Sequence, residues 1–167
     1  MQKTLFTSTA AAEIVLLDYV ATLVANGHER HQHAGRGRPY TNWIREERYR
    51  EWLVDLLASS SATVLLVTAR STKYEQATVA RMREQLGGWM PREWFFNVHD
   101  VAPPLAKRTA LEQFIFPRYG TPDRTRYLAL ESNGSTRAMY AANGIYATPV
   151  PYTGETWSSL PPVPVPG

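Results

Sequence analysis

The stretch Glu13-Ile-Val-Leu-Leu-Asp18-Tyr-Val-Ala-Thr22-Leu23 decides the fold of this chain. Its four consecutive apolar residues are typical of a parallel strand that is buried on both faces. A carboxylate follows the strand directly, and a hydroxyl comes four residues later. Open α/β sheets bind ligands at the carboxyl ends of their strands. The stretch therefore places Asp18 and Thr22 at the mouth of a crevice, where Asp18 is a candidate nucleophile or metal ligand.

Length and composition indicate one soluble globular domain. The chain has 167 residues, of which 44% are hydrophobic and 20% charged, enough to bury a core. It has no cysteine, which excludes disulfides and thiolate sites and agrees with a cytoplasmic location, in the host cell if a phage encodes it. A net charge of +3 permits a phosphate-bearing partner. We expect no membrane association, because no apolar run is long enough to span a bilayer.

Candidate strands and helices alternate after the first strand. They are expected at residues 45–58 (helix), 63–68 (strand), 72–87 (helix), 94–98 (strand), 105–116 (helix), 126–131 (strand), 134–143 (helix) and 145–148 (strand). This alternation is typical of an α/β fold in which helices cover both faces of a parallel sheet. We predict a three-layer Rossmann-like sandwich with a five-stranded parallel sheet in the order 5-4-1-2-3.

The chain divides into three segments. Residues 1–12 lead into the first strand, and residues 13–150 form the domain. No insertion is long enough for a full cap, and the glycine-rich loop at 24–44 is the only candidate for a small lid. Residues 151–167 form a proline-rich tail, which cannot make a strand ladder. We expect this tail to be solvated, so that its removal leaves stability nearly unchanged; the alternative is a docking segment for a protein partner.

Polar side chains follow the later strands as well. Thr68 ends the second strand, Lys107 stands near a helix start, and Glu131 ends the fourth strand. Because parallel strands share one carboxyl edge, these groups should lie near Asp18. Lysine and hydroxyl donors can stabilise the charge of a transferring phosphoryl group, and paired acids can hold Mg²⁺. The pattern therefore suggests phosphoryl transfer.

The order and spacing of these residues resemble the haloacid dehalogenase-like (HAD) hydrolase superfamily. The four matching motifs are Asp18–Thr22, Thr68, Lys107 and Glu131–Asn133. A closer resemblance, over roughly residues 13–150, is to the 3′-phosphatase domain of phage-type polynucleotide kinases. It rests in addition on Gly35–Tyr40, on Val67–Arg70, on Lys73-Tyr74 and on the spacing from Glu131 to Gly144.

The resemblance implies a role for each matched residue. The catalytic residues would be Asp18, Thr68 and Lys107, the phosphate ligands Arg36, Arg70 and Thr22, and the metal ligands Asp18, the backbone carbonyl of Val20, and Glu131. Asp18 would become the phospho-aspartate. Mg²⁺ would be the cofactor, weakly bound or absent. An uncapped site suits a large phosphorylated substrate such as a nucleic-acid end.

Two positions depart from the family pattern. Family phosphatases carry a general acid–base aspartate two residues after the nucleophile, where this chain has Val20. They also carry a second acid after the fourth strand, which is their usual magnesium ligand, where this chain has Ser132. General acid–base catalysis contributes about 10²–10⁴-fold. We therefore interpret the chain as a HAD-like phosphohydrolase-fold protein that binds phosphate or a nucleic-acid end, with weak or lost phosphatase activity.

Two alternatives remain open. The chain could be a non-catalytic structural or interaction protein, possibly from a phage, whose partner uses the old site or the tail. It could also be a metal-free dehalogenase-like hydrolase. Asn133 matches that group, although Glu131 replaces a serine and Thr136 stands where its water-activating aspartate is expected.

The loop at 24–44 carries its own polar groups. His28, His31 and His33 are close enough in sequence to suggest zinc. No rigid element fixes their geometry, so we favour a solvated loop that faces phosphate. Arg36 and Arg38 stand beside glycines, and guanidinium groups match phosphate geometry.

Overall fold

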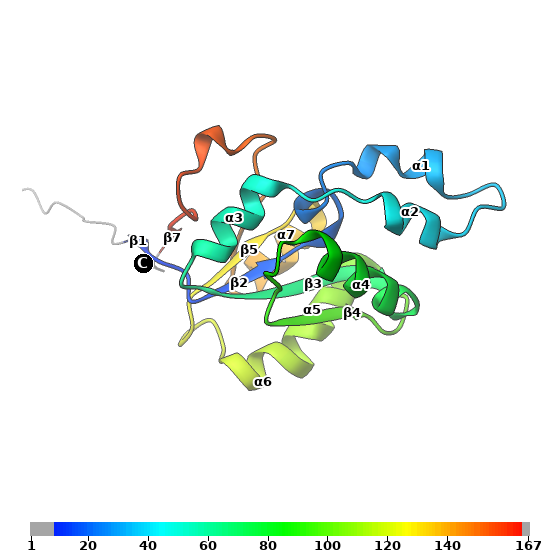
Figure 1. Ribbon diagram of the computed structural model, residues 1–167. Coiled ribbons are helices and arrows are strands. Elements are labelled where there is room, and N and C mark those ends of the chain that lie inside the picture. Colours follow the sequence, from blue (N-terminus) through cyan, green and yellow to red (C-terminus); the bar gives the residue numbers. More distant parts are fainter. Residues whose placement is uncertain (1–8, 165–167) are drawn as a thin grey trace, which may run out of the picture.

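A computed structural model describes residues 9–164 (Figure 1), so residues 1–8 of the expected lead-in lie outside the described part. The strands are β1 (Thr9–Ala10), β2 (Ile14–Leu17), β3 (Thr63–Ser71), β4 (Glu93–Asn97), β5 (Tyr127–Leu130), β6 (Tyr146–Thr148) and β7 (Val163–Pro164). The α-helices are α1 (Arg30–His33), α2 (Tyr40–Glu46), α3 (Glu51–Ser59), α4 (Glu75–Gln85), α5 (Pro103–Ala110), α6 (Phe116–Tyr119) and α7 (Gly134–Ala142). Short helical turns lie at Tyr19–Leu23, Gly27–Glu29, Thr72–Tyr74, Leu111–Ile115 and Gly154–Thr156.

The predicted five-stranded parallel sheet is present, in the order β4-β3-β2-β5-β6. These labels differ from the predicted 5-4-1-2-3 because β1 lies outside this sheet. Counted from β2 as the first strand, the sheet reads 3-2-1-4-5, which is the same succession seen from the opposite edge. Leu17 at the end of β2 pairs with Leu66 of β3 and Leu130 of β5. Asp18 therefore leaves the sheet at the middle of its carboxyl edge.

Two hydrophobic layers hold the helices on the sheet. Val15 and Leu17 point to the face covered by α3 and α4, and Ile14 and Leu16 point to the face covered by α5 and α7. All four side chains are at most 6% exposed. A strand buried on both faces needs this continuous apolar run, and each such side chain contributes roughly 1.5–3 kcal/mol. The quoted stretch thus fixes β2 as the centre of the fold.

The segment expected to be a loop at 24–44 is partly helical. It contains α1 and α2, joined by a tight turn, and it projects from the domain (Figure 1). The single helix predicted over 45–58 is wrong for residues 47–50, because residues 45–46 end α2 and α3 begins only at Glu51. A bridge between Val24 and Tyr49, followed by a 2.8 Å bond from Arg50 N to the Leu23 carbonyl, keeps this part extended.

The expectation of a solvated tail over 151–167 is wrong for residues 151–164, and residues 165–167 lie outside the described part. β7 pairs with β1, the Trp157 ring meets Trp52 edge-on at 5.9 Å, and Val163 is 8% exposed. Proline removes backbone donors, but it does not prevent the apolar residues between the prolines from packing on α3. A Cβ at Gly154 would lie 2.9 Å from the Trp52 ring, so glycine permits this close approach. The segment is therefore part of the domain.

Candidate active site

Asp18 lies at the carboxyl end of β2 and is contacted by donors from three parts of the chain. Thr22 Oγ1 donates to Asp18 Oδ2 at 2.8 Å, and Ser132 Oγ lies 3.0 Å from the same oxygen. Lys107 Nζ donates to Asp18 Oδ1 at 2.8 Å. The side chain is 8% exposed. These contacts fix the carboxylate in one orientation.

Lys107 bridges two carboxylates. Its Nζ lies 2.8 Å from Asp18 Oδ1 and 2.5 Å from Glu131 Oε2, and its side chain is 2% exposed. Burial on its own would lower the pKa of Lys107, but the charges of Asp18 and Glu131 outweigh it and raise that pKa. Lys107 is therefore a buried cation that pairs with both acids.

The charge of Glu131 depends on pH near neutrality. Burial, and then the charge of Asp18, raises the pKa of Glu131 to about 7. Lys107 and the backbone N–H of Asn133, which donates to Oε1 at 3.0 Å, oppose this rise. One cation cannot compensate two buried anions in a low-dielectric site. Protonation of Glu131 is therefore favoured at pH values where an ordinary glutamate would be ionised.

This arrangement predicts a pH-dependent stability. Because the pKa of Glu131 is higher in the folded state, its contribution is present at low pH and is lost as pH rises from about 4.5 to about 7. The loss is at most about 3 kcal/mol. Glu131→Gln should remove this pH dependence, so the variant should gain stability relative to the parent between pH 5 and pH 8.

Urea unfolding at a series of pH values checks this expectation. Glu112→Gln, at an exposed position of the turn after α5, is the matched control and should follow the parent at every pH. Parallel curves for Glu131→Gln and the parent would show that Glu131 keeps an ordinary pKa.

The expected metal ligands do not form a magnesium site. Ser132 Oγ lies 3.0 Å from Asp18 Oδ2 and 3.3 Å from the Val20 carbonyl, so a hydroxyl sits between two of the three expected ligands. Lys107 occupies the third, Glu131. Within residues 9–164, no three His, Asp or Glu side chains gather to hold a metal ion. Mg²⁺ needs near-octahedral oxygen coordination that includes free carboxylates, and these residues do not supply it.

Arg70 is paired inside the protein. Its guanidinium donates to Glu47 through two bonds, Nη1 to Oε1 at 2.9 Å and Nη2 to Oε2 at 2.6 Å. The side chains are 2% and 0% exposed. Tyr40 Oη accepts from Nη2 at 3.1 Å, and the guanidinium lies over the Tyr19 ring at 4.6 Å. A phosphate could use Arg70 only after displacing Glu47.

The remaining expected residues divide into two groups. The described contacts join Asp18, Thr22, Lys107, Glu131 and the Val20 carbonyl into one cluster. No hydrogen bond among residues 9–164 joins this cluster to the side chains of Thr68, Arg36 or Arg70. The Thr68 hydroxyl accepts from the Arg70 backbone N–H at 3.1 Å. Arg36 is exposed in the turn at the outer end of the projecting segment (Figure 1).

Sequence reasoning missed Glu47 and Arg50. Arg50 Nε donates to the Thr22 carbonyl at 3.0 Å, and Nη2 donates to that of Ala21 at 3.4 Å. Ala21 has a φ of +60°, a left-handed conformation that non-glycine residues rarely adopt. Arg50 therefore supports the strained turn that follows Asp18. Both residues stand in a run of arginines and glutamates. The local sequence does not distinguish Glu47, which is buried, or Arg50, which contacts the turn after Asp18, from the other members of that run.

The alternative sites find little support. Asn133 Oδ1 accepts from the backbone N–H of Thr136 at 2.9 Å and lies 3.1 Å from its hydroxyl, so Asn133 caps α7 and is contacted by Thr136 inside the helix. Thr136 is fully buried and offers no base for a dehalogenase-like reaction. His33 stacks on Trp43 at 6.1 Å, and His28 approaches Glu29 at 3.9 Å. The described residues thus form no zinc site from the histidines.

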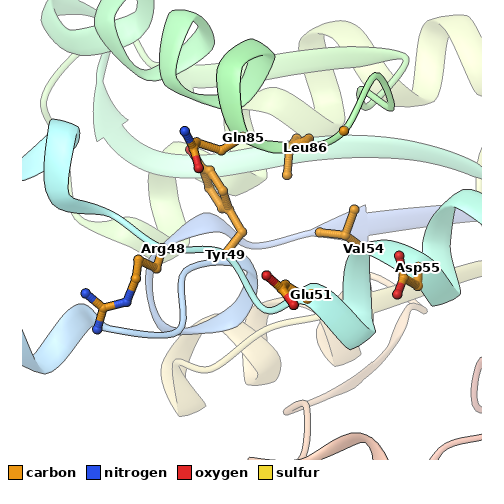
Figure 2. Close-up of a pocket in the computed structure, with 8 residues that line it drawn as sticks. Arg48, Tyr49, Glu51, Val54, Asp55, Gln85 and Leu86 are labelled. Atoms are coloured by element: carbon orange, nitrogen blue, oxygen red, sulfur yellow. The ribbon is translucent and has the colours of Figure 1, made fainter.

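The main surface hollows lie away from Asp18. Five surface hollows in the described part of the chain are lined without Asp18. The one in Figure 2, of about 310 Å³, lies between α3 and the end of α4, where Glu51 and Asp55 face Gln85. It approaches the site only through Tyr49, whose hydroxyl lies 2.7 Å from that of Tyr19. Asp18, with 8% of its side chain exposed, lies outside these five hollows.

Comparisons with known proteins place the fold. No protein-family model and no curated protein matches the sequence. Among solved structures, the chain resembles a chain of the Pnkp1/Rnl/Hen1 RNA repair complex, with a TM-score of 0.61 and 13% sequence identity. The match covers 90% of this chain and 48% of that one, so this chain spans about half of its length. At this identity the similarity concerns the fold. Within residues 9–164, no helix has the length and apolar character to cross a bilayer.

Proposed function

We propose that this chain is a HAD-like phosphohydrolase-fold protein that binds a phosphorylated ligand, such as a nucleic-acid end, with weak or lost phosphatase activity. The observation that carries this proposal is the cluster of Asp18, Thr22 and Lys107 at the carboxyl edge of the central strand. Hydroxyl and ammonium donors around one carboxylate suit a phosphoryl group. The fold shared with a chain of an RNA repair complex agrees with such a ligand.

Weak turnover follows from two side chains. Val20, 36% exposed beside Asp18, can neither protonate a leaving group nor activate water. Ser132 contacts the two oxygens that would otherwise hold a cation, so no metal ion there adds to Lys107 in offsetting the repulsion between Asp18 and an incoming phosphate. In this proposal Lys107 and Thr22, which are buried against Asp18, exchange their contacts with its carboxylate for phosphate oxygens. Asp18 is then a nucleophile without an acid–base group beside it.

The charge of Asp18 should therefore limit binding. Asp18→Asn keeps the shape of the side chain and removes one negative charge next to Lys107. At a protein surface, two unit charges about 4 Å apart interact by about 4 kcal/mol, so even partial relief should tighten phosphate binding by about tenfold. Any residual turnover should disappear. Calorimetric titration of inorganic phosphate and of a 3′-phosphorylated oligonucleotide at two salt concentrations checks this expectation.

Asp123→Asn is the matched control. Asp123 is exposed and precedes β5, so it lies toward the opposite edge of the sheet, and its replacement changes the net charge equally. Equal tightening in both variants would assign the effect to net charge. If neither the parent nor Asp18→Asn binds phosphate at low salt, the phosphate-site proposal fails.

A second function, a non-catalytic interaction protein, is favoured by the Arg70–Glu47 pair. Arg70 forms a bidentate ion pair with the buried Glu47, and only 2% of the Arg70 side chain is exposed. A ligand therefore has no direct access to this guanidinium. A protein that uses this fold only as a scaffold can keep such a pair. This function predicts that neither phosphate nor a 3′-phosphorylated end binds, so the titration above also separates the two proposals.

A further inference from the structure

The segment from Asn26 to Arg48, here called the arm, is rooted beside the candidate site. It follows the turn that carries Thr22 and returns to the domain where Ala25 N donates to the Arg48 carbonyl at 2.8 Å. Between these ends, α1 and α2 extend away from the sheet (Figure 1). A long ligand at the carboxyl edge of the sheet can therefore extend along the arm.

The arm has a net charge of +2, compared with +3 for the whole protein. It has five arginines and three glutamates, while the whole chain has 18 basic and 15 acidic residues. Glu47 is buried against Arg70, so only Glu29 and Glu46 oppose the arginines at the surface. The five arginines are exposed, and they are Arg30, Arg36, Arg38, Arg45 and Arg48.

Most of these guanidinium groups are not neutralised. Arg48 pairs with Glu29 at 2.8 Å, and Arg38 donates to the uncharged carbonyl of Gln32. In residues 9–164, the side chains of Arg30, Arg36 and Arg45 make no recorded ion pair or hydrogen bond. Arg36 stands in a tight turn with a φ of +51°, a position that costs a non-glycine residue roughly 1–2 kcal/mol. The arm thus exposes guanidinium groups that are not paired with other groups of the described chain.

Two hollows on the arm are lined by these groups. One, of about 580 Å³, is lined by His31, Gln32, Arg36 and Arg38 together with backbone-rich Ala34 and Gly35. The other, of about 320 Å³, is lined by His33, Arg38, Asn42, Arg45 and Glu46. Arg38 belongs to both, so the hollows adjoin. Apart from Glu46, their charged and amide side chains can donate hydrogen bonds to phosphate oxygens.

The arm lacks the apolar surface that other partners need. The large exposed hydrophobic residues of the described chain all lie outside it: Val20, Val98, Leu105, Phe114, Tyr146 and Tyr152. Protein interfaces have an apolar core, and membrane-surface helices insert an apolar face. A repeated phosphate backbone needs only closely spaced cations and hydrogen-bond donors.

We propose that the arm is a docking surface for the phosphate backbone of a nucleic-acid strand, with Arg36, Arg38 and Arg45 as its main contacts. This surface is separate from the Asp18 cluster and binds internal phosphates, whatever the chemistry at the strand end. It orients a strand along the arm toward the carboxyl edge of the sheet.

The test is binding of a fluorescent single-stranded oligodeoxythymidine without terminal phosphates, measured by anisotropy between 50 and 200 mM salt, about the range over which counterion release is resolved. Arg36→Ala with Arg45→Ala should weaken binding at low salt by about tenfold or more. It should also reduce the slope of log Kd against log salt by about 1.4, since each lost single-strand contact contributes about 0.7. Both positions are exposed, so circular dichroism should be unchanged.

Arg108→Ala with Arg124→Ala removes the same charge from exposed sites outside the arm and should bind like the parent. Equal loss in both double variants, or no oligonucleotide binding by the parent at low salt, would overturn the proposal. Equally tight binding of polyglutamate would overturn the assignment to nucleic acid. The oligonucleotide has no phosphorylated end, so these results do not depend on whether the Asp18 cluster binds phosphate.

Discussion

Val20→Asp combined with Ser132→Asp should raise phosphatase activity on a 3′-phosphorylated oligonucleotide by roughly 10²–10⁴-fold, the usual contribution of a general acid–base group. Val20 is partly exposed with an extended backbone (φ −70°, ψ 129°) that an aspartate adopts readily. Ser132 is exposed and already contacts Asp18 and the Val20 carbonyl. An aspartate at position 132 would place a second carboxylate beside that of Asp18, where a cation could bind both. Lys107 would still bridge Asp18 and Glu131.

Magnesium should also stabilise this double variant. A new carboxylate near Asp18 repels it in the absence of a cation, and an ion that binds only the folded state raises the melting temperature by mass action. Val20→Asn with Ser132→Asn is the matched control, of similar size without the charges, and should gain neither activity nor magnesium dependence. A folded aspartate variant without increased activity would show that the site lacks more than these two groups.

The second large effect concerns the C-terminal segment. Ending the chain after Pro151 should destabilise it by about 3 kcal/mol or more, because Trp157, Leu160 and Val163 then leave the core. Trp157→Ala alone should cost about 2 kcal/mol, since the ring is only partly buried. For a chain of this size this corresponds to a fall in Tm of about 4–8 °C.

Tyr152→Ala is the control within the same segment. Its side chain is 85% exposed, and only its backbone carbonyl is used, by Arg50 at 3.0 Å. This variant should melt with the parent. If truncation after Pro151 left the Tm unchanged, the packing of the segment on α3 would be contradicted and the solvated tail expected from the prolines would be right.

The fold could be predicted because its signal is local and repeated. The three central strands, β3, β2 and β5, each contain a short apolar run, and these runs end near Thr68, Asp18 and Glu131. Sheet position then follows from the general rule that parallel strands share their carboxyl edge. The same rule explains why Asp18, Lys107 and Glu131, separated by up to 113 residues, could be assigned to one cluster from the sequence.

The partner of Arg70 could not be predicted in this way. Glu46 and Glu47 are chemically identical neighbours, and only the chain reversal after α2 decides that Glu47 is buried while Glu46 stays exposed. Such a pairing depends on tertiary geometry across 23 residues. For Ser132 the sequence showed the change of residue but not its contacts. Its identity showed that an acid was missing, but only the structure shows its hydroxyl between Asp18 and the Val20 carbonyl.

Composition misled the prediction for the C-terminal segment. A high proline content excludes a central strand, but it does not exclude packing. Trp157 and Val163 are spaced so that each reaches the domain, and Gly154 lets the backbone approach Trp52. Trp157 and Gly154 both contact Trp52, which lies about a hundred residues earlier in the chain. A rule based on local composition does not detect such contacts.

Calorimetric titration of inorganic phosphate into the parent protein, once with Mg²⁺ and once with EDTA, tests whether the Asp18 cluster binds phosphate without a metal ion. Binding of equal affinity is expected in both conditions, because Ser132 rather than a cation contacts Asp18 and the Val20 carbonyl. Mg²⁺ alone should produce no heat of binding up to millimolar concentrations. Phosphate binding that requires Mg²⁺, or no phosphate binding in either condition, would contradict a metal-independent phosphate site at Asp18.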